Sequence, residues 1–171
     1  MTKSLILALS AILTLAACAG ADDPGSAMTD AEKLAEIRQM YDGYRSDFPE
    51  VEDISAEELL ALRENRPVVI VDVRKTKERR ISTIPGAITP EELGTLPEGA
   101  LVVTYCTVGY RSGLHADKLR RQGIEVKNLA GSLLSWAHAG GDLVDAEGPT
   151  KRLHVYGKKW NLAPEAFEAV W

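Results

Sequence analysis

The sequence predicts an α/β protein whose mostly parallel central sheet has about five strands and is covered by helices on both faces. Apolar, β-branched runs alternate with helical patterns over about a hundred residues, which is typical of such sheets. The run at residues 68–73 is apolar except for Asp72, as expected of a strand buried on both faces. With 45% hydrophobic and 26% charged residues, the 171-residue chain has an ordinary globular composition and the size of one domain with extensions.

The first residues have the pattern of a targeting segment. Lys3 precedes a largely apolar run at 4–17 that is shorter than the roughly 20 residues a membrane-spanning helix needs. The following Leu-Ala-Ala-Cys at 15–18 resembles the lipobox of bacterial lipoproteins, in which cleavage leaves a lipidated cysteine. We therefore expect a signal peptide at 1–17 and lipidation at Cys18. An ordinary secretory signal with an incidental cysteine is the alternative.

This interpretation places the protein in the bacterial cell envelope, lipid-anchored and facing the periplasm. The outer membrane is slightly favoured because Ala19, and not an aspartate, follows the cysteine. Residues 18–28 are expected to form the lipidated N-terminus and a flexible tether. The membrane is then contacted through the lipid anchor only, and an envelope protein is a candidate partner. The net charge of −5, with acidic residues spread along the chain, argues against nucleic-acid binding.

Residues 29–49 are expected to form an N-terminal helical extension. Thr29 and Glu32 fit a capping box, apolar residues follow at helical spacing, and Phe48-Pro49 ends the helix. The alternating domain is predicted at residues 50–145. Its expected elements, in chain order, are a strand at 51–54, a helix capped by Ser55 and Glu58 that runs to 62, a strand at 68–73, a strand or turn at 84–88, a brief helix at 90–93, the central strand at 101–105, a helix at 113–122 closed by Gly123, a strand at 124–129 and a helix at 132–139.

The C-terminal tail, residues 146–171, is expected to pack on the domain. It mixes basic and aromatic side chains, and Pro164 is expected to begin a last short helix that ends in Trp171. A binding strip is the alternative, but amphipathic tails usually dock on their own domain.

The chemistry is concentrated in the stretch Cys106-Thr-Val-Gly-Tyr-Arg111-Ser112, directly after the central strand. Ligands of open α/β sheets bind beyond the carboxyl ends of the strands, and Cys106 lies at such an end. Backbone N–H groups of residues 107–111 can surround the sulfur, and the next helix adds its positive N-terminal end. This setting lowers a thiol pKa and holds an anion beside it. A thiolate next to an anion site suits sulfur transfer from a donor such as thiosulfate.

Cys106 is therefore the predicted catalytic nucleophile. The predicted substrate-binding residues are Thr107, Val108, Gly109, Tyr110 and Arg111, and the predicted supporting residues are Asp72, Arg74 and Ser112. Gly109 is expected to supply a backbone angle that the tight loop needs.

Other interpretations of these residues stay open. One alternative is that Cys106 is only a small buried apolar residue. Another is that Arg111 only pairs with an acid at the sheet edge. For Asp72 we favour an anchoring role toward the backbone or Arg74. The histidines are scattered without ligand spacing, so neither a metal site nor a cofactor is predicted.

Five segments, in order, resemble the rhodanese family over about residues 50–145. They are Ile54-Ser-Ala-Glu-Glu-Leu59, Val71-Asp-Val-Arg74 with Glu78, Ile84-Pro-Gly-Ala-Ile88, Tyr105 to Ser112, and Asn128-Leu-Ala-Gly131 with Trp136. The resemblance implies a rhodanese-like fold and a sulfurtransferase of the thiosulfate type. It also implies that Cys106 forms a persulfide, that Arg111 contacts the donor anion, and that a thiol or cyanide is the acceptor.

Loop length separates this resemblance from its relatives. Cysteine-dependent phosphatases of the same fold have five residues between cysteine and arginine, whereas four separate Cys106 and Arg111. The smaller ring favours sulfur over a phosphoryl group and disfavours phosphatase or oxyanion reduction. Thr107 and Val108 are uncharged where many family members have a second basic residue, which leaves the donor open. A non-catalytic binding or regulatory module at the envelope is the alternative function.

Overall fold

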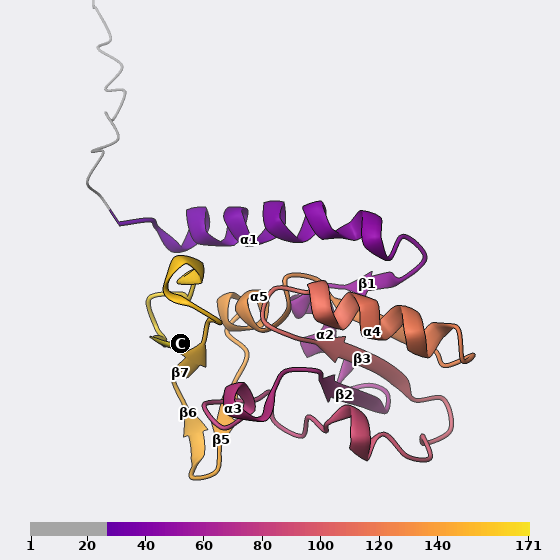
Figure 1. The fold of residues 1–171 in the computed structure, drawn as a ribbon. Coiled ribbons are helices and arrows are strands. Elements are labelled where there is room, and N and C mark those ends of the chain that lie inside the picture. The colour runs from indigo at the N-terminus through magenta and orange to yellow at the C-terminus, as the bar shows by residue number, and fades with distance from the viewer. Residues whose placement is uncertain (1–26) are drawn as a thin grey trace, which may run out of the picture.

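A four-stranded parallel sheet forms the centre of the computed structural model, which describes residues 27–171 (Figure 1). The strand order is β1-β4-β3-β2. The bounds are Glu52–Ile54 for β1, Val68–Asp72 for β2, Leu101–Tyr105 for β3 and Val126–Leu129 for β4. Every residue of β3 is buried, as expected of a central strand.

Helices cover both faces of this sheet, as predicted. Successive side chains of a strand point to opposite faces. In β3, Leu101 and Val103 belong to a hydrophobic cluster with α2 (Ala56–Leu62) and α5 (Ser132–His138). Val102, between them, belongs to a second cluster with α4 (Tyr110–Arg120).

The N-terminal extension packs on both clusters. It consists of α1 (Asp30–Tyr44) followed by the short helix η1 (Arg45–Asp47). The predicted capping boxes are present: Thr29 with Glu32 starts α1, and Ser55 with Glu58 starts α2. Ile37 of α1 is buried in the first cluster, and Tyr41 is buried in the second. This helix is therefore part of the core.

The sheet has four strands and not about five, because residues 84–88 form a turn. A single bridge between Val71 and Ile88 joins this turn to β2. Pro85 has no N–H to donate, and Gly86 has a φ of +76°, so a continuous ladder cannot form there. Two short helices flank this region, α3 (Thr76–Arg79) and η2 (Pro90–Glu92).

The helix after the reactive loop starts earlier than predicted. α4 begins at Tyr110 and not at 113, with Gly109 as its N-cap residue. Gly113 is therefore inside the helix, where it lies against the ring of Phe48. A glycine is needed here because a larger side chain would collide with Phe48, and not because the helix begins at this residue.

The C-terminal tail differs most from the prediction. β5 (Leu143–Asp145) and β6 (Gly148–Thr150) form an antiparallel hairpin, and β7 (Arg152–His154) pairs in parallel with β8 (Glu168–Val170). The short helix η3 (Lys158–Trp160) lies between them. The predicted helix from Pro164 to Trp171 is wrong, because the backbone of its second half takes part in the β7–β8 ladder. Leu153 and Val155 are completely buried in the cluster of α2 and α5.

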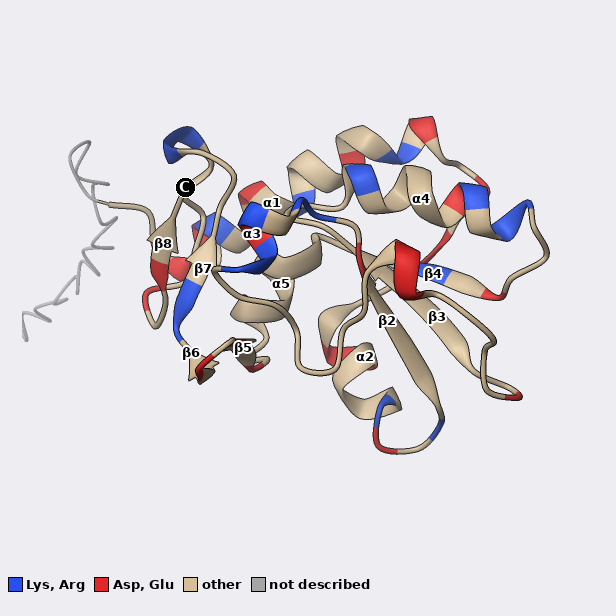
Figure 2. Ribbon diagram, turned by 60° about the horizontal axis from the view of Figure 1, so that its bottom comes forward, with Lys and Arg blue, Asp and Glu red and all other residues tan. Residues whose placement is uncertain are grey.

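The expected signal peptide at 1–17, Cys18 and most of the tether lie outside the described residues. Within residues 27–171, no helix has both the length and the apolar character that a bilayer span requires. Acidic and basic residues of this part are interspersed over helices and loops (Figure 2).

Candidate active site

Cys106 directly follows β3, at the carboxyl end of the sheet where ligands of this fold class bind. Its backbone N–H donates to Ser132 Oγ at 3.0 Å, and its carbonyl accepts the N–H of Leu133 at 3.2 Å. The start of α5 therefore holds the backbone of the cysteine. The sulfur accepts the N–H of Gly109 at 3.2 Å. Of the backbone N–H groups of residues 107–111 that were expected around the sulfur, this one lies at hydrogen-bond distance from it.

Gly109 adopts a conformation that no other residue would adopt without strain. Its φ is +120°, and a Cβ at this position would lie 2.5 Å from the ring of Tyr41. The Asn128 amide donates to the Gly109 carbonyl at 3.0 Å and to the Tyr41 hydroxyl at 2.9 Å. That hydroxyl in turn donates to the carboxylate of Asp53. α1 and β4 thus hold the loop from behind.

The loop favours the thiolate form of Cys106. Burial alone raises the pKa of this thiol, but the charge and hydrogen bonds around the sulfur outweigh burial and lower the pKa below its ordinary value. They are the positive charge of Arg111, hydrogen bonds from Ser112 and the Gly109 N–H. The positive N-terminal end of α4 begins at the next residue and acts in the same direction.

Arg111 is held by an acid. Its two terminal nitrogens donate to the two carboxylate oxygens of Glu78 at 2.8 and 2.7 Å, and one of them also reaches Thr107 Oγ1 at 3.3 Å. Burial raises the pKa of Glu78, but the Arg111 hydrogen bonds and the Lys75 N–H outweigh it and bring the pKa to about 2. Such a bidentate pair is strong and fixed in geometry. Arg111 is therefore paired with an acid, which was the alternative role considered for this residue.

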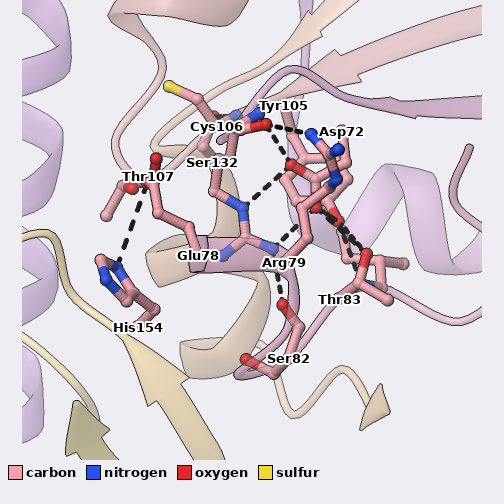
Figure 3. A network of polar contacts seen from close by, with 12 residues as sticks. Asp72, Glu78, Arg79, Ser82, Thr83, Tyr105, Cys106, Thr107, Ser132 and His154 are labelled. Carbon is pink, nitrogen blue, oxygen red and sulfur yellow. Dashed lines mark hydrogen bonds and ion pairs between the residues drawn. The ribbon is translucent and has the colours of Figure 1, made fainter. Parts of the chain in front are cut away.

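Asp72 and Arg74 form a second ion pair, buried beside the loop. The Asp72 carboxylate accepts from the backbone N–H of Arg74 at 3.0 Å and from its guanidinium at 2.9 and 2.7 Å. It also accepts the hydroxyl protons of Tyr105 and Thr83. In Figure 3, Asp72, Tyr105 and Thr83 lie together on one side of Cys106, whose sulfur points away from them. This pair anchors Tyr105, the residue before Cys106, in keeping with the anchoring role favoured for Asp72.

A pocket of about 220 Å³ opens above the sulfur and is called here the Cys106 pocket. Its lining residues are Tyr44, Cys106, Thr107, Val108, Tyr110, Arg111, Tyr156 and Trp160. Five of the eight are predicted catalytic or substrate-binding residues. Gly109 and Ser112 do not line the pocket, and Ser112 Oγ lies 3.2 Å from the Gly109 carbonyl oxygen.

Sequence reasoning missed several residues of this site. Glu78 was part of a segment that resembles the family, but it was given no role in the site. The signal for it was Arg111, because an arginine in a buried loop needs an acidic partner. Tyr44, Tyr156 and Trp160 reach the pocket from the two extensions, and no local pattern indicates this. His154 lies in the tail as well, with Nδ1 4.0 Å from the Glu78 carboxylate (Figure 3).

Comparisons with known proteins agree with this geometry. The family model of the rhodanese-like domain matches residues 55–139. The chain is similar to a sulfurtransferase of Allochromatium vinosum, with 33% identity over 106 residues that cover 57% of this chain and 99% of that protein. It is also similar to a tRNA sulfurtransferase of Desulfurococcus amylolyticus, with 39% identity over 67 residues, or 38% of this chain and only 14% of that protein.

Among solved structures, a thiosulfate sulfurtransferase from Pseudomonas aeruginosa superimposes with a TM-score of 0.53 at 25% sequence identity. The match covers 64% of this chain and 23% of that one. The loop geometry, the family match and a relative aligned over nearly its whole length lead to one conclusion: the chain belongs to the rhodanese-like domain family.

Proposed function

We propose that the protein carries a sulfane sulfur as a persulfide on Cys106, from an anionic donor of the thiosulfate type to a thiol or cyanide acceptor. The observation that carries the proposal is the Gly109 N–H at 3.2 Å from a sulfur whose pKa is lowered. A buried structural cysteine needs neither feature. The sulfurtransferase names of the relatives support the same class of reaction.

The residues support a two-step reaction. The Cys106 thiolate attacks the outer sulfur of the donor, so that an S–S bond forms to Sγ. The bond between the two donor sulfurs breaks, and sulfite leaves with its electron pair when thiosulfate is the donor. The Gly109 N–H and the start of α4 stabilise the negative charge before and after this step. The acceptor then attacks the outer sulfur, and the thiolate leaves unchanged.

Mass spectrometry of the intact protein tests the persulfide. After incubation with thiosulfate, and separately with organic thiosulfonates, we expect the chain to gain the mass of one sulfur atom, and peptide mapping to place it on Cys106. The Cys106→Ser variant should gain nothing. If every donor leaves the mass of the wild-type protein unchanged, the proposal fails and a binding module takes its place.

We also propose that the protein is anchored to the bacterial envelope by lipid on Cys18 and faces the periplasm. The lipobox-like sequence at 15–18 supports this proposal. The full chain expressed in a bacterial host should incorporate a labelled fatty acid and fractionate with membranes, and Cys18→Ala should abolish both. Labelling that survives this substitution would contradict it.

A further inference from the structure

Four aromatic side chains surround the opening of the Cys106 pocket. Tyr44 and Tyr110 lie with ring centroids 5.2 Å apart, and Tyr156 and Trp160 with centroids 6.3 Å apart. Only Tyr110 comes from residues 55–139, which match the family model. The aromatic rim, these four residues, is thus built mainly by α1 and the C-terminal tail.

Tyr156 is held over the loop in a strained conformation. Its φ is 72°, in the left-handed region that is strained for any residue other than glycine. Its backbone N–H donates to His154 Nδ1 at 3.1 Å, and its ring lies over the Arg111 guanidinium at 5.6 Å. Yet 59% of Tyr156 is exposed. An exposed aromatic residue held at such a cost next to a nucleophile points to contact with a ligand.

The charge of the pocket is smaller than its arginine suggests. Among the described residues that line the pocket, Arg111 is the one basic residue, and both its terminal nitrogens donate to the Glu78 carboxylate. The ion pair as a whole is neutral. Apart from Cys106, the rest of the lining consists of phenol rings, an indole, Val108 and Thr107. A donor with two negative charges loses hydration when it enters the pocket, and little positive charge is available to offset that cost.

The volume of the pocket accommodates a ring. An apolar cavity of about 150 Å³ is enough to bind benzene, and the Cys106 pocket measures about 220 Å³. Aromatic rings pack well against other aromatic rings at centroid distances of about 4.5–7 Å. The distances within the rim fall in the same range.

We propose that the donor for Cys106 is a singly charged organic sulfane-sulfur compound, whose hydrocarbon or aromatic group binds the aromatic rim, in preference to the thiosulfate dianion. This inference rests on the sulfurtransferase function proposed above and names its substrate class. With a thiosulfonate as donor, the thiolate forms an S–S bond to the outer sulfur. The bond from that sulfur to the sulfonyl sulfur breaks, and a sulfinate leaves with the electron pair.

Three donors separate the contributions of charge and ring. Benzenethiosulfonate and methanethiosulfonate carry one charge and differ in the ring, whereas thiosulfate carries two charges and has no organic group. We measure the rate constant of Cys106 persulfidation for each and divide it by the rate constant of the same donor with a free thiol. We expect the normalised value to be about tenfold higher for the benzene compound than for the methane compound, and lowest for thiosulfate.

Variants of the aromatic rim assign the preference to it. Tyr156→Ala should reduce the normalised rate with benzenethiosulfonate about fivefold more than the normalised rate with methanethiosulfonate. Trp160→Leu should act in the same direction if the first variant is unstable. The matched control is Trp171→Ala, since Trp171 is an equally exposed aromatic residue of the same tail and does not line the pocket.

Glu78→Gln tests the charge argument. This change frees the positive charge of Arg111, so the rate with thiosulfate should rise relative to that with methanethiosulfonate. An unchanged ratio would contradict the charge argument.

The outcomes distinguish the two proposals. If none of the donors modifies Cys106, the sulfurtransferase function fails. If all modify it and the two thiosulfonates react equally after normalisation, or if thiosulfate reacts fastest, the function stands and the inference about the donor is wrong. An equal loss with both thiosulfonates in Tyr156→Ala would likewise remove the aromatic rim from substrate binding.

Discussion

The guanidinium of Arg111 lies between the Glu78 carboxylate and the ring of Tyr156. Its planar, bidentate geometry suits this position, and a lysine would not reproduce it. The family resemblance implied that Arg111 contacts a donor anion. In the structure its terminal nitrogens donate to the Glu78 carboxylate, so its positive charge lowers the pKa of Cys106 mainly by electrostatic attraction through space.

The Glu78–Arg111 pair predicts a specific dependence of stability on pH. The pKa of Glu78 is about 2 in the folded chain and ordinarily 4.5, so the pair stabilises the fold above pH 4.5, and this contribution is lost as the pH falls toward 2. The difference is at most about 3 kcal/mol. Urea unfolding of wild type and Glu78→Gln should show a gap at pH 6 that closes toward pH 2. A gap that stays constant with pH would contradict the low pKa of Glu78.

The thiol pKa of Cys106 should depend on the charge of Arg111. To avoid leaving a buried carboxylate unpaired, the Arg111→Met change is made in Glu78→Gln protein and compared with Glu78→Gln alone. The pH profile of alkylation by iodoacetamide should shift upward toward the ordinary value of about 8.5. Arg121→Met in the same background is the control, since Arg121 is an exposed arginine at the far end of α4. Equal shifts in both variants would exclude a local effect.

At the scale of elements, aromatic rings of the N-terminal extension pack closely against two glycines, one in the Cys106 loop and one in α4. Gly109 lies against the Tyr41 ring of α1, and Gly113 of α4 lies against the Phe48 ring that follows η1. Both contacts put the N-terminal extension directly behind the segment that bears Cys106. The extension therefore sets the position of the reactive loop.

Two helical glycines should respond oppositely to substitution by alanine. Gly43 of α1 has no neighbour within 4 Å of an added Cβ, so Gly43→Ala should stabilise the protein by about 0.5–1 kcal/mol. At Gly113 an added Cβ would lie 2.3 Å from the Phe48 ring, so Gly113→Ala should destabilise it by about 1–3 kcal/mol. Thermal unfolding measures both. Stabilisation by Gly113→Ala would show that the two elements do not pack as described.

Elements whose ends are marked locally could be predicted. Capping residues such as Thr29 and Ser55 satisfy the first N–H groups of their own helix, and buried strands such as β3 are continuous apolar runs. The segment after Pro164 could not, because its strand exists through backbone pairing with β7, far away in the sequence. The start of α4 was mispredicted for a different reason: the special backbone angle expected at Gly109 is present, but the sequence does not show that this residue is also the N-cap of the helix.

At the scale of the whole molecule, the two extensions belong to the domain. The tail places Leu153 and Val155 in the core cluster, and the Glu165 N–H donates to the Asp30 carboxylate at the start of α1. The predicted reactive residues lie together because one loop contains them, and sequence reasoning could recover that part of the site. The aromatic rim comes from three separate segments, and only the folded chain brings these together.

Removal of residues 151–171 should therefore do more than shorten the chain. It uncovers the apolar surface against which Leu153 and Val155 pack, each worth about 1.5–3 kcal/mol when buried. We expect a lower melting temperature, binding of a hydrophobic dye, and loss of the preference for ring-bearing donors. The single substitution Trp171→Ala, at the exposed end of the tail, should have none of these effects. A truncated chain that melts like the full one would contradict the packing of the tail.

Tyr156 and Trp160 lie 50 and 54 positions after Cys106 in the sequence, which also has a consequence for biosynthesis. On the ribosome, the strand, the cysteine and α4 are made well before these two residues emerge. During that interval the reactive sulfur lacks half of its aromatic rim. We therefore expect the Cys106 sulfur to be more accessible to oxidants and to other thiols until Tyr156 and Trp160 have emerged and packed over the pocket.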